Sequence, residues 1–173
     1  MGISRLNHAV LYVRDTARST AFYGQVLGFR VKAELPRGAG AFLQAPSSTN
    51  DHDLAVFALG DRAAASPAGR TSVGLYHLAW EVETLADLEE HRGRLAAAGA
   101  LVGESDHGTS KSLYGRDPDG LEFEVVWLIP AHLVQDGDRE VMTRPLDLER
   151  EKARFGATTR GGLGVSVPLG VTL

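Results

Sequence analysis

The sequence predicts an α+β protein built from two tandem βαβββ modules followed by a C-terminal extension. Three observations support this class. A segment of β-favouring residues occurs twice, with a histidine at the same place in each copy. Each copy is followed by a segment with helical periodicity and then by further strand-like segments. The length of 173 residues is enough for a proper hydrophobic core, and an apolar share of 43% is usual for a globular protein.

The repeated segment carries most of this prediction. Residues 75–82 repeat residues 6–13 at an offset of 77 − 8 = 69 positions, with a leucine, the histidine and the closing valine in register. An internal repeat of this kind constrains the whole fold. Each half-sheet alone would leave one face bare, so we expect the two copies to form one curved mixed sheet around a shared cleft.

The first module is assigned to residues 1–62. Residues 6–13 have the composition and partial alternation of a strand. Asp15 is typical of a helix N-cap, and Gly28 is typical of the left-handed residue that ends a helix. A helix is therefore expected between them, to about Leu27. The remaining strands are expected at residues 29–35, 41–44 and 54–59, with a turn at Gly38 and Gly40 between the first two.

A small-residue, proline-containing linker at residues 63–73 precedes the second module, residues 74–130. Thr84 and Asp87 resemble a capping box, which predicts a helix that ends at Gly99. Strands are expected at residues 75–82, near 100–102 and at 121–128. The extension, residues 131–173, contains a short charged helix at 146–155 and a glycine-rich tail that is either frayed or ordered by a partner chain.

Composition argues against several classes of function. The 18 basic and 22 acidic residues give a net charge of −4, which provides no electrostatic basis for binding nucleic acid or an anionic membrane. The absence of cysteine excludes disulfides, thiolate zinc sites and cysteine nucleophiles, so a metal would need histidine and carboxylate ligands. No apolar run approaches the ~20 residues of a membrane span, and the first residues lack the pattern of a signal peptide. We therefore expect a cytoplasmic protein.

Three residues form a candidate metal site: the repeated histidines His8 and His77, and Glu124 in an apolar strand. Each alone is a weak signal, because strand histidines are often ordinary hydrogen-bonded residues and the face that carries Glu124 could be solvated. A buried carboxylate, however, needs a partner or a metal. Together the three make the 2-His-1-carboxylate set typical of non-haem Fe(II), with positions open for substrate and O₂. Alignment of the modules places Ala55 opposite Glu124, so a four-ligand site with one carboxylate per repeat is not available.

A longer motif surrounds Glu124 and spans residues 107–124. Its members are His107, Leu113, Tyr114, Asp117, Pro118, Gly120 and Glu124. With the duplicated pattern, this motif resembles the vicinal oxygen chelate superfamily, and within it the chain is similar to the type I extradiol ring-cleaving dioxygenases over about residues 3–130. The resemblance implies a metal held by His8, His77 and Glu124: Fe(II), with Mn(II) as an alternative that suits the same ligands.

The resemblance also implies three catalytic residues. His52, before the last strand of the first module, would be the acid–base group, a common role for histidine near neutral pH. Without the resemblance, His52 reads as an ordinary loop histidine between two aspartates. His107 and Tyr114 would orient the substrate oxygen. The implied reactants are O₂ and a small aromatic diol, whose ring would open beside the two hydroxyl groups to give a semialdehyde or keto acid. A homo-oligomer (dimer or higher) is also expected. Candidate walls of the cleft are Phe42, Phe57, Tyr76, Trp80 and Trp127.

Two alternative functions use the same fold. A metal-free binding protein, like the bleomycin-resistance proteins, would sequester an aromatic ligand and would not need the three metal ligands together. A metal isomerase or lyase of the glyoxalase or epimerase type is the second alternative. By resemblance, that chemistry usually uses a fourth ligand, which Ala55 does not supply.

Overall fold

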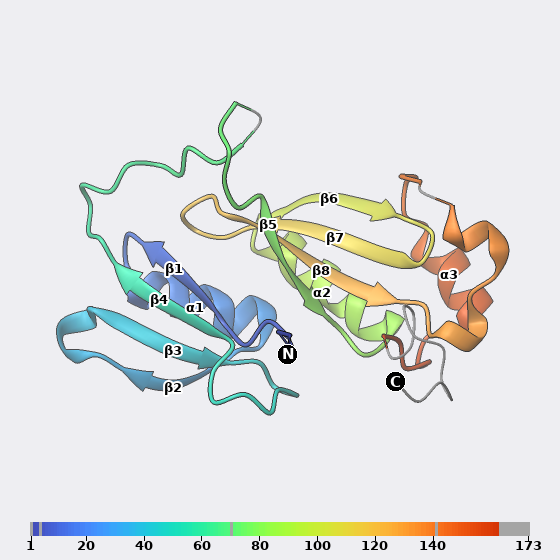
Figure 1. Ribbon diagram of the computed structural model, residues 1–173, viewed down its shortest axis with the longest axis horizontal. Coiled ribbons are helices and arrows are strands. Elements are labelled where there is room, and N and C mark those ends of the chain that lie inside the picture. Colours follow the sequence, from blue (N-terminus) through green and yellow to red (C-terminus); the bar gives the residue numbers. More distant parts are fainter. Residues whose placement is uncertain (1, 4, 70, 141, 163–173) are drawn as a thin grey trace. The chain divides into compact units, whose positions relative to one another are not determined.

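The computed structural model describes residues 2–3, 5–69, 71–140 and 142–162 of the chain (Figure 1). It contains the two βαβββ modules that the sequence predicts. The first comprises β1 (Ala9–Val13), α1 (Thr16–Leu27), β2 (Arg30–Glu34), β3 (Gly40–Gln44) and β4 (Leu54–Ala58). The second comprises β5 (His77–Glu81), α2 (Leu85–Ala97), β6 (Leu101–Asp106), β7 (Ser110–Arg116) and β8 (Glu122–Leu128). Single 3₁₀ turns at Pro36–Gly38, Ala131–Leu133 and Asp136–Arg139, and the helix α3 (Leu148–Phe155), complete the described elements.

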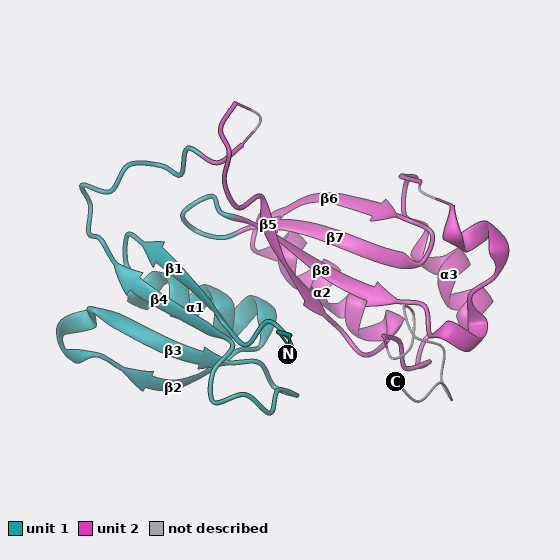
Figure 2. Ribbon diagram, in the orientation of Figure 1, with its two compact units in different colours: residues 1–67, 117–121 teal, residues 68–116, 122–173 magenta. Residues whose placement is uncertain are grey.

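The strands form two four-stranded sheets, with the orders β1-β4-β3-β2 and β5-β8-β7-β6. In each sheet the first pair is parallel and the other pairs are antiparallel, so the sheets are mixed, as the sequence predicts. Within the described residues the strand ladders are therefore two, one per module, where the sequence suggested a single curved sheet. The chain divides into unit 1, residues 1–67 with 117–121, and unit 2, residues 68–116 with 122–173 (Figure 2). Residues 163–173, most of the expected glycine-rich tail, lie outside the described part.

The strand registers confirm the duplication at the level of single residues. In unit 1, Val10 of β1 is paired with Ala55 of β4. In unit 2, Ala79 of β5 is paired with Glu124 of β8. Both pairs are related by the predicted offset, since 79 − 10 = 69 and 124 − 55 = 69. Ala55 and Glu124 are therefore equivalent positions, and unit 1 has no carboxylate where unit 2 has its strand glutamate.

The helix boundaries follow the predicted caps. The Asp15 side chain accepts a hydrogen bond from the backbone N–H of Arg18, and Gly28 ends α1 with a φ of 78°. Thr84 and Asp87 form the reciprocal capping box at the start of α2. These side chains satisfy backbone N–H groups that have no partner inside the helix. The cap residues could be found from sequence because their contacts lie within one turn of the helix.

The strand β7 is the element that the sequence pattern did not single out. Its residues Ser110, Lys111, Ser112 and Arg116 are polar, which removes the apolar alternation that marks a strand. Two of them are nevertheless buried, because Lys111 and Ser112 have exposures of 1% and 0%. These polar residues of β7 can be buried because the interior of unit 2 around Lys111 is itself polar.

That interior is a cluster of buried charges that connects the extension to the sheet. The Lys111 Nζ lies 2.5 Å from Asp106 Oδ1 and 3.2 Å from Glu151 Oε2 of α3. Arg150, which is partly exposed, pairs with both carboxylates. Asp106 and Glu151 are themselves almost completely buried. Nearby, Trp127 of β8 packs against Phe155 with a ring-centroid distance of 5.5 Å. The short charged helix of the extension is thus confirmed, and it is part of the folded core (Figure 1).

The turn at residues 117–121 is counted with unit 1 (Figure 2). Asp117 Oδ1 accepts hydrogen bonds from the backbone N–H groups of Asp119 and Leu121, and its Oδ2 accepts one from the Tyr23 hydroxyl at 3.2 Å. Arg18 donates to the Pro118 carbonyl and to the Asp119 carboxylate. These contacts hold the turn in a defined place against α1.

Replacement of Lys111 by Met tests the buried cluster. The variant keeps the apolar stem and removes the ammonium group, so two buried carboxylates lose their buried cation and keep the ion pairs with the exposed Arg150. We expect the free energy of unfolding to fall by roughly 3–5 kcal/mol in urea denaturation. The control is Lys152→Met, because Lys152 forms ion pairs with Glu89 and Glu149 at the surface and should matter little. Equal effects of the two substitutions would contradict this view of the cluster.

Replacement of Asp117 by Asn tests the buried turn through its pH dependence. Burial raises the pKa of Asp117 above its ordinary value of 3.8, although hydrogen bonds from the Leu121 and Asp119 amides offset part of this. A raised pKa means that the folded state favours the protonated carboxyl. Its contribution to stability is therefore complete below pH 3.8 and is lost as the pH rises through the folded-state pKa. Asn cannot titrate, so the stability of the variant relative to wild type should increase with pH across this range. A constant difference in urea denaturation would contradict the prediction.

Candidate functional site

The site in unit 2 is built on the sheet face opposite α2. Glu124 of β8 has Ala79 of β5 on one side and Tyr114 of β7 on the other. His77 begins β5 two residues before Ala79, so alternation directs its side chain to the face that carries Glu124. The His77 Nε2 lies 3.1 Å from Glu124 Oε2. The Glu124 side chain is 12% exposed and that of His77 is 26% exposed. The largely buried carboxylate therefore has the partner that the sequence analysis expects for it.

The arrangement of His77 and Glu124 fits a metal ion. First-row metals take nitrogen and oxygen ligands at about 2.0–2.2 Å, so two ligands at a right angle lie about 3 Å apart. The 3.1 Å separation of the two groups matches this spacing. The buried Nδ1 of His77 has no hydrogen-bond partner among the residues that the structure describes. Among the described residues, no three His, Asp or Glu side chains are close enough together to bind a metal ion. His77 and Glu124 are a pair in unit 2, and His8 belongs to unit 1.

Tyr114 and His107 lie together beside this pair. The Tyr114 hydroxyl is 2.8 Å from His107 Nε2, and the Tyr114 ring is 5.8 Å from the His77 ring between centroids. Burial raises the pKa of Tyr114, and the negative charge of Glu124 raises it further. The phenol therefore keeps its proton near neutral pH and serves as a hydrogen-bond donor. The structure thus brings together four of the six predicted site residues: His77, Glu124, Tyr114 and His107.

The other two predicted residues, His8 and His52, lie together in unit 1. Their rings are 4.5 Å apart between centroids. The His52 Nδ1 lies 3.0 Å from the carboxylate of Asp51, and a hydrogen bond from His52 lowers the pKa of Asp51. Phe42 packs edge-on against His52 at 5.1 Å between ring centroids. Asp51 was not singled out from the sequence, although its position next to His52 was a usable signal.

The expected aromatic walls separate into two groups. Phe42 and Phe57 are in contact beside His52, and Tyr76 packs on His77 at 4.8 Å between ring centroids. The prediction for Trp127 is wrong: it has no exposed surface and packs against Phe155 in the core. Trp127 is three residues from Glu124, and strand alternation places residues an odd number apart on opposite faces.

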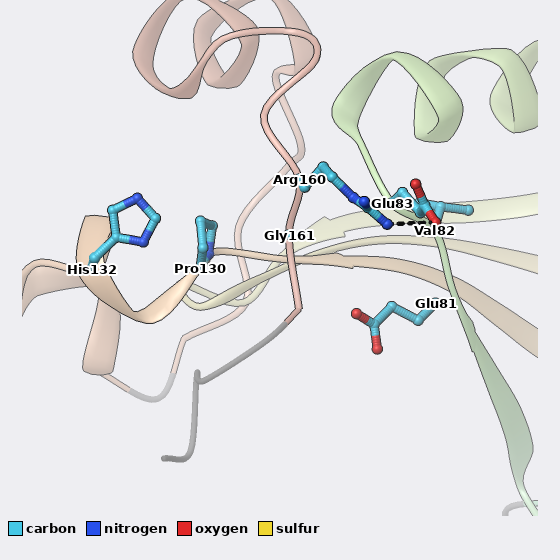
Figure 3. Close-up of a pocket in the computed structure, with 7 residues that line it drawn as sticks. All are labelled: Glu81, Val82, Glu83, Pro130, His132, Arg160 and Gly161. Atoms are coloured by element: carbon cyan, nitrogen blue, oxygen red, sulfur yellow. Dashed lines mark ion pairs between the residues drawn. The ribbon is translucent and has the colours of Figure 1, made fainter. Parts of the chain in front are cut away.

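A separate cavity of about 470 Å³ lies at the other end of β5 (Figure 3). Its lining residues are Glu81, Val82, Glu83, Pro130, His132, Arg160 and Gly161. The Arg160 guanidinium is paired with Glu83 at 2.9 Å, whereas the Glu81 carboxylate points away from this pair and lies against Gly162 (Figure 3). Burial raises the pKa of Glu81. Because His77 begins β5 and Glu81 ends it, this cavity is distinct from the site at Glu124.

The longest described helix, α2, has 13 residues, and no helix in the described ranges is both long and apolar enough to cross a bilayer.

Curated relatives include two dioxygenases. The chain is 30% identical over 150 residues to catechol-2,3-dioxygenase of Bacillus subtilis (strain 168), an alignment that covers 84% of this chain and 50% of the relative. It is 36% identical over 124 residues to biphenyl-2,3-diol 1,2-dioxygenase 3 of Rhodococcus globerulus, covering 70% of this chain and 62% of the relative. The chain thus spans about half the length of the first relative and less than two thirds of the second.

Solved structures of this fold carry several activities in their names. A glyoxylase/bleomycin resistance protein/dioxygenase domain from Frankia sp. EAN1pec superposes with a TM-score of 0.64 at 24% identity, covering 77% of this chain and 98% of that one, and shows the shared fold. Lactoylglutathione lyase from Agrobacterium tumefaciens superposes with a TM-score of 0.55 at 27% identity, covering 73% and 95%. Residues 5–125 match the sequence profile of one family, and the fold agrees with it: the chain belongs to the Glyoxalase/Bleomycin resistance protein/Dioxygenase superfamily.

Proposed function

We propose that this protein is a non-haem Fe(II)-dependent extradiol dioxygenase that cleaves a catechol-type aromatic ring with O₂. The observation that carries the proposal is the His77–Glu124 pair, 3.1 Å apart on a half-buried sheet face beside Tyr114 and His107. Two curated relatives with dioxygenase names, at 30% and 36% identity, support the reaction class.

His77 and Glu124 would hold the metal together with His8, which we propose as the third ligand. A histidine, histidine and carboxylate set leaves positions open on the metal, which suits Fe(II) and also Mn(II). The bound ion would supply the redox chemistry that lets O₂ react with the ring. The equivalence of Ala55 and Glu124 in the two sheets means that unit 1 adds no carboxylate at the matching position.

The remaining site residues would handle protons and orient the ring. Asp51 accepts the hydrogen bond of His52 Nδ1–H, which leaves Nε2 as the nitrogen that exchanges a proton with the substrate. His52 would thus be the acid–base group. Tyr114 would hydrogen-bond a substrate oxygen, His107 would orient the Tyr114 hydroxyl to which it is hydrogen-bonded, and Phe42 would face the aromatic ring. Both atoms of O₂ enter the product, so ring opening beside the diol gives a semialdehyde or keto acid and needs no external reductant.

A lyase or isomerase is the second candidate function, because lactoylglutathione lyase from Agrobacterium tumefaciens shares the fold at 27% identity. The methyl side chain of Ala55 disfavours it, since no fourth ligand is available at that position. A metal-free binding protein is disfavoured by the buried His77–Glu124 pair, which is costly to keep without a role. Consumption of O₂ with a panel of catechols under air separates the dioxygenase from both.

Replacement of Glu124 by Gln tests the metal site. The change preserves the shape and removes the charged ligand, so iron content after anaerobic reconstitution should fall roughly tenfold or more. The control is Glu122→Gln, two residues along β8 on the same face, where the Glu122 carboxylate forms an ion pair with the exposed Arg116. The control should bind iron as wild type does. Undiminished iron in Glu124→Gln, or no iron in wild type, would contradict the proposed site.

Replacement of His52 by Ala tests the acid–base assignment. Iron content should stay at the wild-type level, because His52 is not a proposed ligand, while turnover of a catechol should fall by about 10²–10⁴-fold. The readouts are iron content and the rate of O₂ uptake. His132→Ala, in the separate cavity, is the matched control and should keep its activity. Normal turnover in His52→Ala would show that another group moves the proton.

A further inference from the structure

His107 lies between two elements of unit 2 that are distant in sequence. Its Nε2 is 2.8 Å from the Tyr114 hydroxyl of β7. Its Nδ1 is 3.0 Å from the backbone carbonyl oxygen of Met142, in the C-terminal extension. The Thr143 hydroxyl is also near Nδ1, at 3.3 Å. Both ring nitrogens of this half-buried histidine therefore have partners, one from the site and one from the extension.

The chemistry of these partners determines the direction of the two hydrogen bonds. A carbonyl oxygen can only accept, so His107 Nδ1 must carry the hydrogen. A neutral imidazole has one N–H group, so Nε2 accepts, and the Tyr114 hydroxyl donates to it. The Tyr114 hydroxyl has one hydrogen, and it is the donor in the 2.8 Å contact with Nε2. The phenol proton thus points to His107, and the oxygen, which lies beside the Ser112 side chain, can still accept a hydrogen bond from a ligand.

The segment that carries Met142 is attached to the sheet next to His107. Asp106 and Arg144 exchange two backbone hydrogen bonds, of 2.8 and 2.9 Å. The Asp106 carboxylate in turn binds Lys111 and Arg150, and Lys111 pairs with Glu151 of α3. The residue that precedes His107 is therefore fixed by the extension through its backbone and by the buried charges through its side chain.

The loop after His107 is equally close to the extension. Gly108 has a φ of 78°, and a Cβ at this position would lie 2.3 Å from the carbonyl oxygen of Asp138. Asp138 is held by Arg154 of α3 through two bonds of 2.7 Å. Only glycine allows this approach of the two backbones. The extension therefore contacts the chain on both sides of His107.

We propose that the C-terminal extension is the positioning element of the site: the Met142 carbonyl holds His107 in its Nδ1–H tautomer, so that Tyr114 presents its oxygen as a hydrogen-bond acceptor. Beside Glu124 and His77, this acceptor selects a ligand that brings a hydroxyl hydrogen to Tyr114. The statement about the ligand rests on the proposed function, whereas the tautomer does not and can be measured in metal-free protein. Met142 acts through His107 and is a positioning residue.

Nuclear magnetic resonance of the metal-free full chain, labelled with ¹⁵N in histidine, tests the proposal. Long-range ¹⁵N–¹H correlations at mildly alkaline pH distinguish the protonated from the unprotonated ring nitrogen, and the His107→Gln variant assigns the signals. We expect Nδ1 of His107 to be the protonated nitrogen, although free histidine in water favours Nε2–H. In Tyr114→Phe the tautomer should persist while the Nε2 resonance shifts. A predominant Nε2–H form in wild type would overturn the proposal, whatever the variants do.

A backbone variant tests the role of the extension itself. Arg144→Pro removes the N–H that donates to the Asp106 carbonyl and should reduce or abolish the Nδ1–H preference of His107. Thr143→Val keeps the Met142 carbonyl and is the control, in which the tautomer should not change. An unchanged tautomer in folded Arg144→Pro would overturn the positioning role. If His107 has the Nδ1–H form but the protein binds no iron, the positioning role stands and only the proposed function is contradicted.

Discussion

The parallel pairing of β5 with β8 is the constraint on which the site in unit 2 depends. It sets Ala79 beside Glu124, and strand alternation then places His77 on the same face. A shift of one residue would turn the histidine to the α2 side and leave a buried carboxylate without a partner. The antiparallel neighbour β7 adds Tyr114 directly opposite Glu124. The ladder of one mixed sheet therefore determines which polar groups meet.

The buried charges of unit 2 have a related structural role on the opposite face. A lysine, an aspartate and a glutamate in the interior are poor contributors to stability compared with apolar residues, but each is costly to leave alone. Lys111, Asp106 and Glu151 satisfy one another only when α3 lies against β6 and β7. This requirement makes the extension an integral part of the unit. It also places the backbone of residues 142–144 beside His107, where hydrogen bonding to the imidazole becomes possible.

Relatives of this chain include dioxygenases and a lyase, so membership of the superfamily alone does not select a reaction. The selection has to come from the site. A strand glutamate in unit 2 is matched by an alanine at the equivalent place in unit 1. In the proposed metal site, this asymmetry would leave positions open that a fourth protein ligand would close.

Sequence patterns were enough to predict the duplication, the two modules and the helix caps, and to propose six candidate site residues. Those features depend on local patterns, such as the reciprocal bonds of Thr84 and Asp87 within one helical turn. The sequence did not reveal β7, because the buried Lys111 has the polarity of a surface residue, and it misplaced Trp127 because residue type does not report which face of a strand is covered. The structure adds the 3.1 Å distance between the predicted partners His77 and Glu124, and it shows that the partner of His107 is a backbone carbonyl. A carbonyl has no signature in the sequence, because every residue has one.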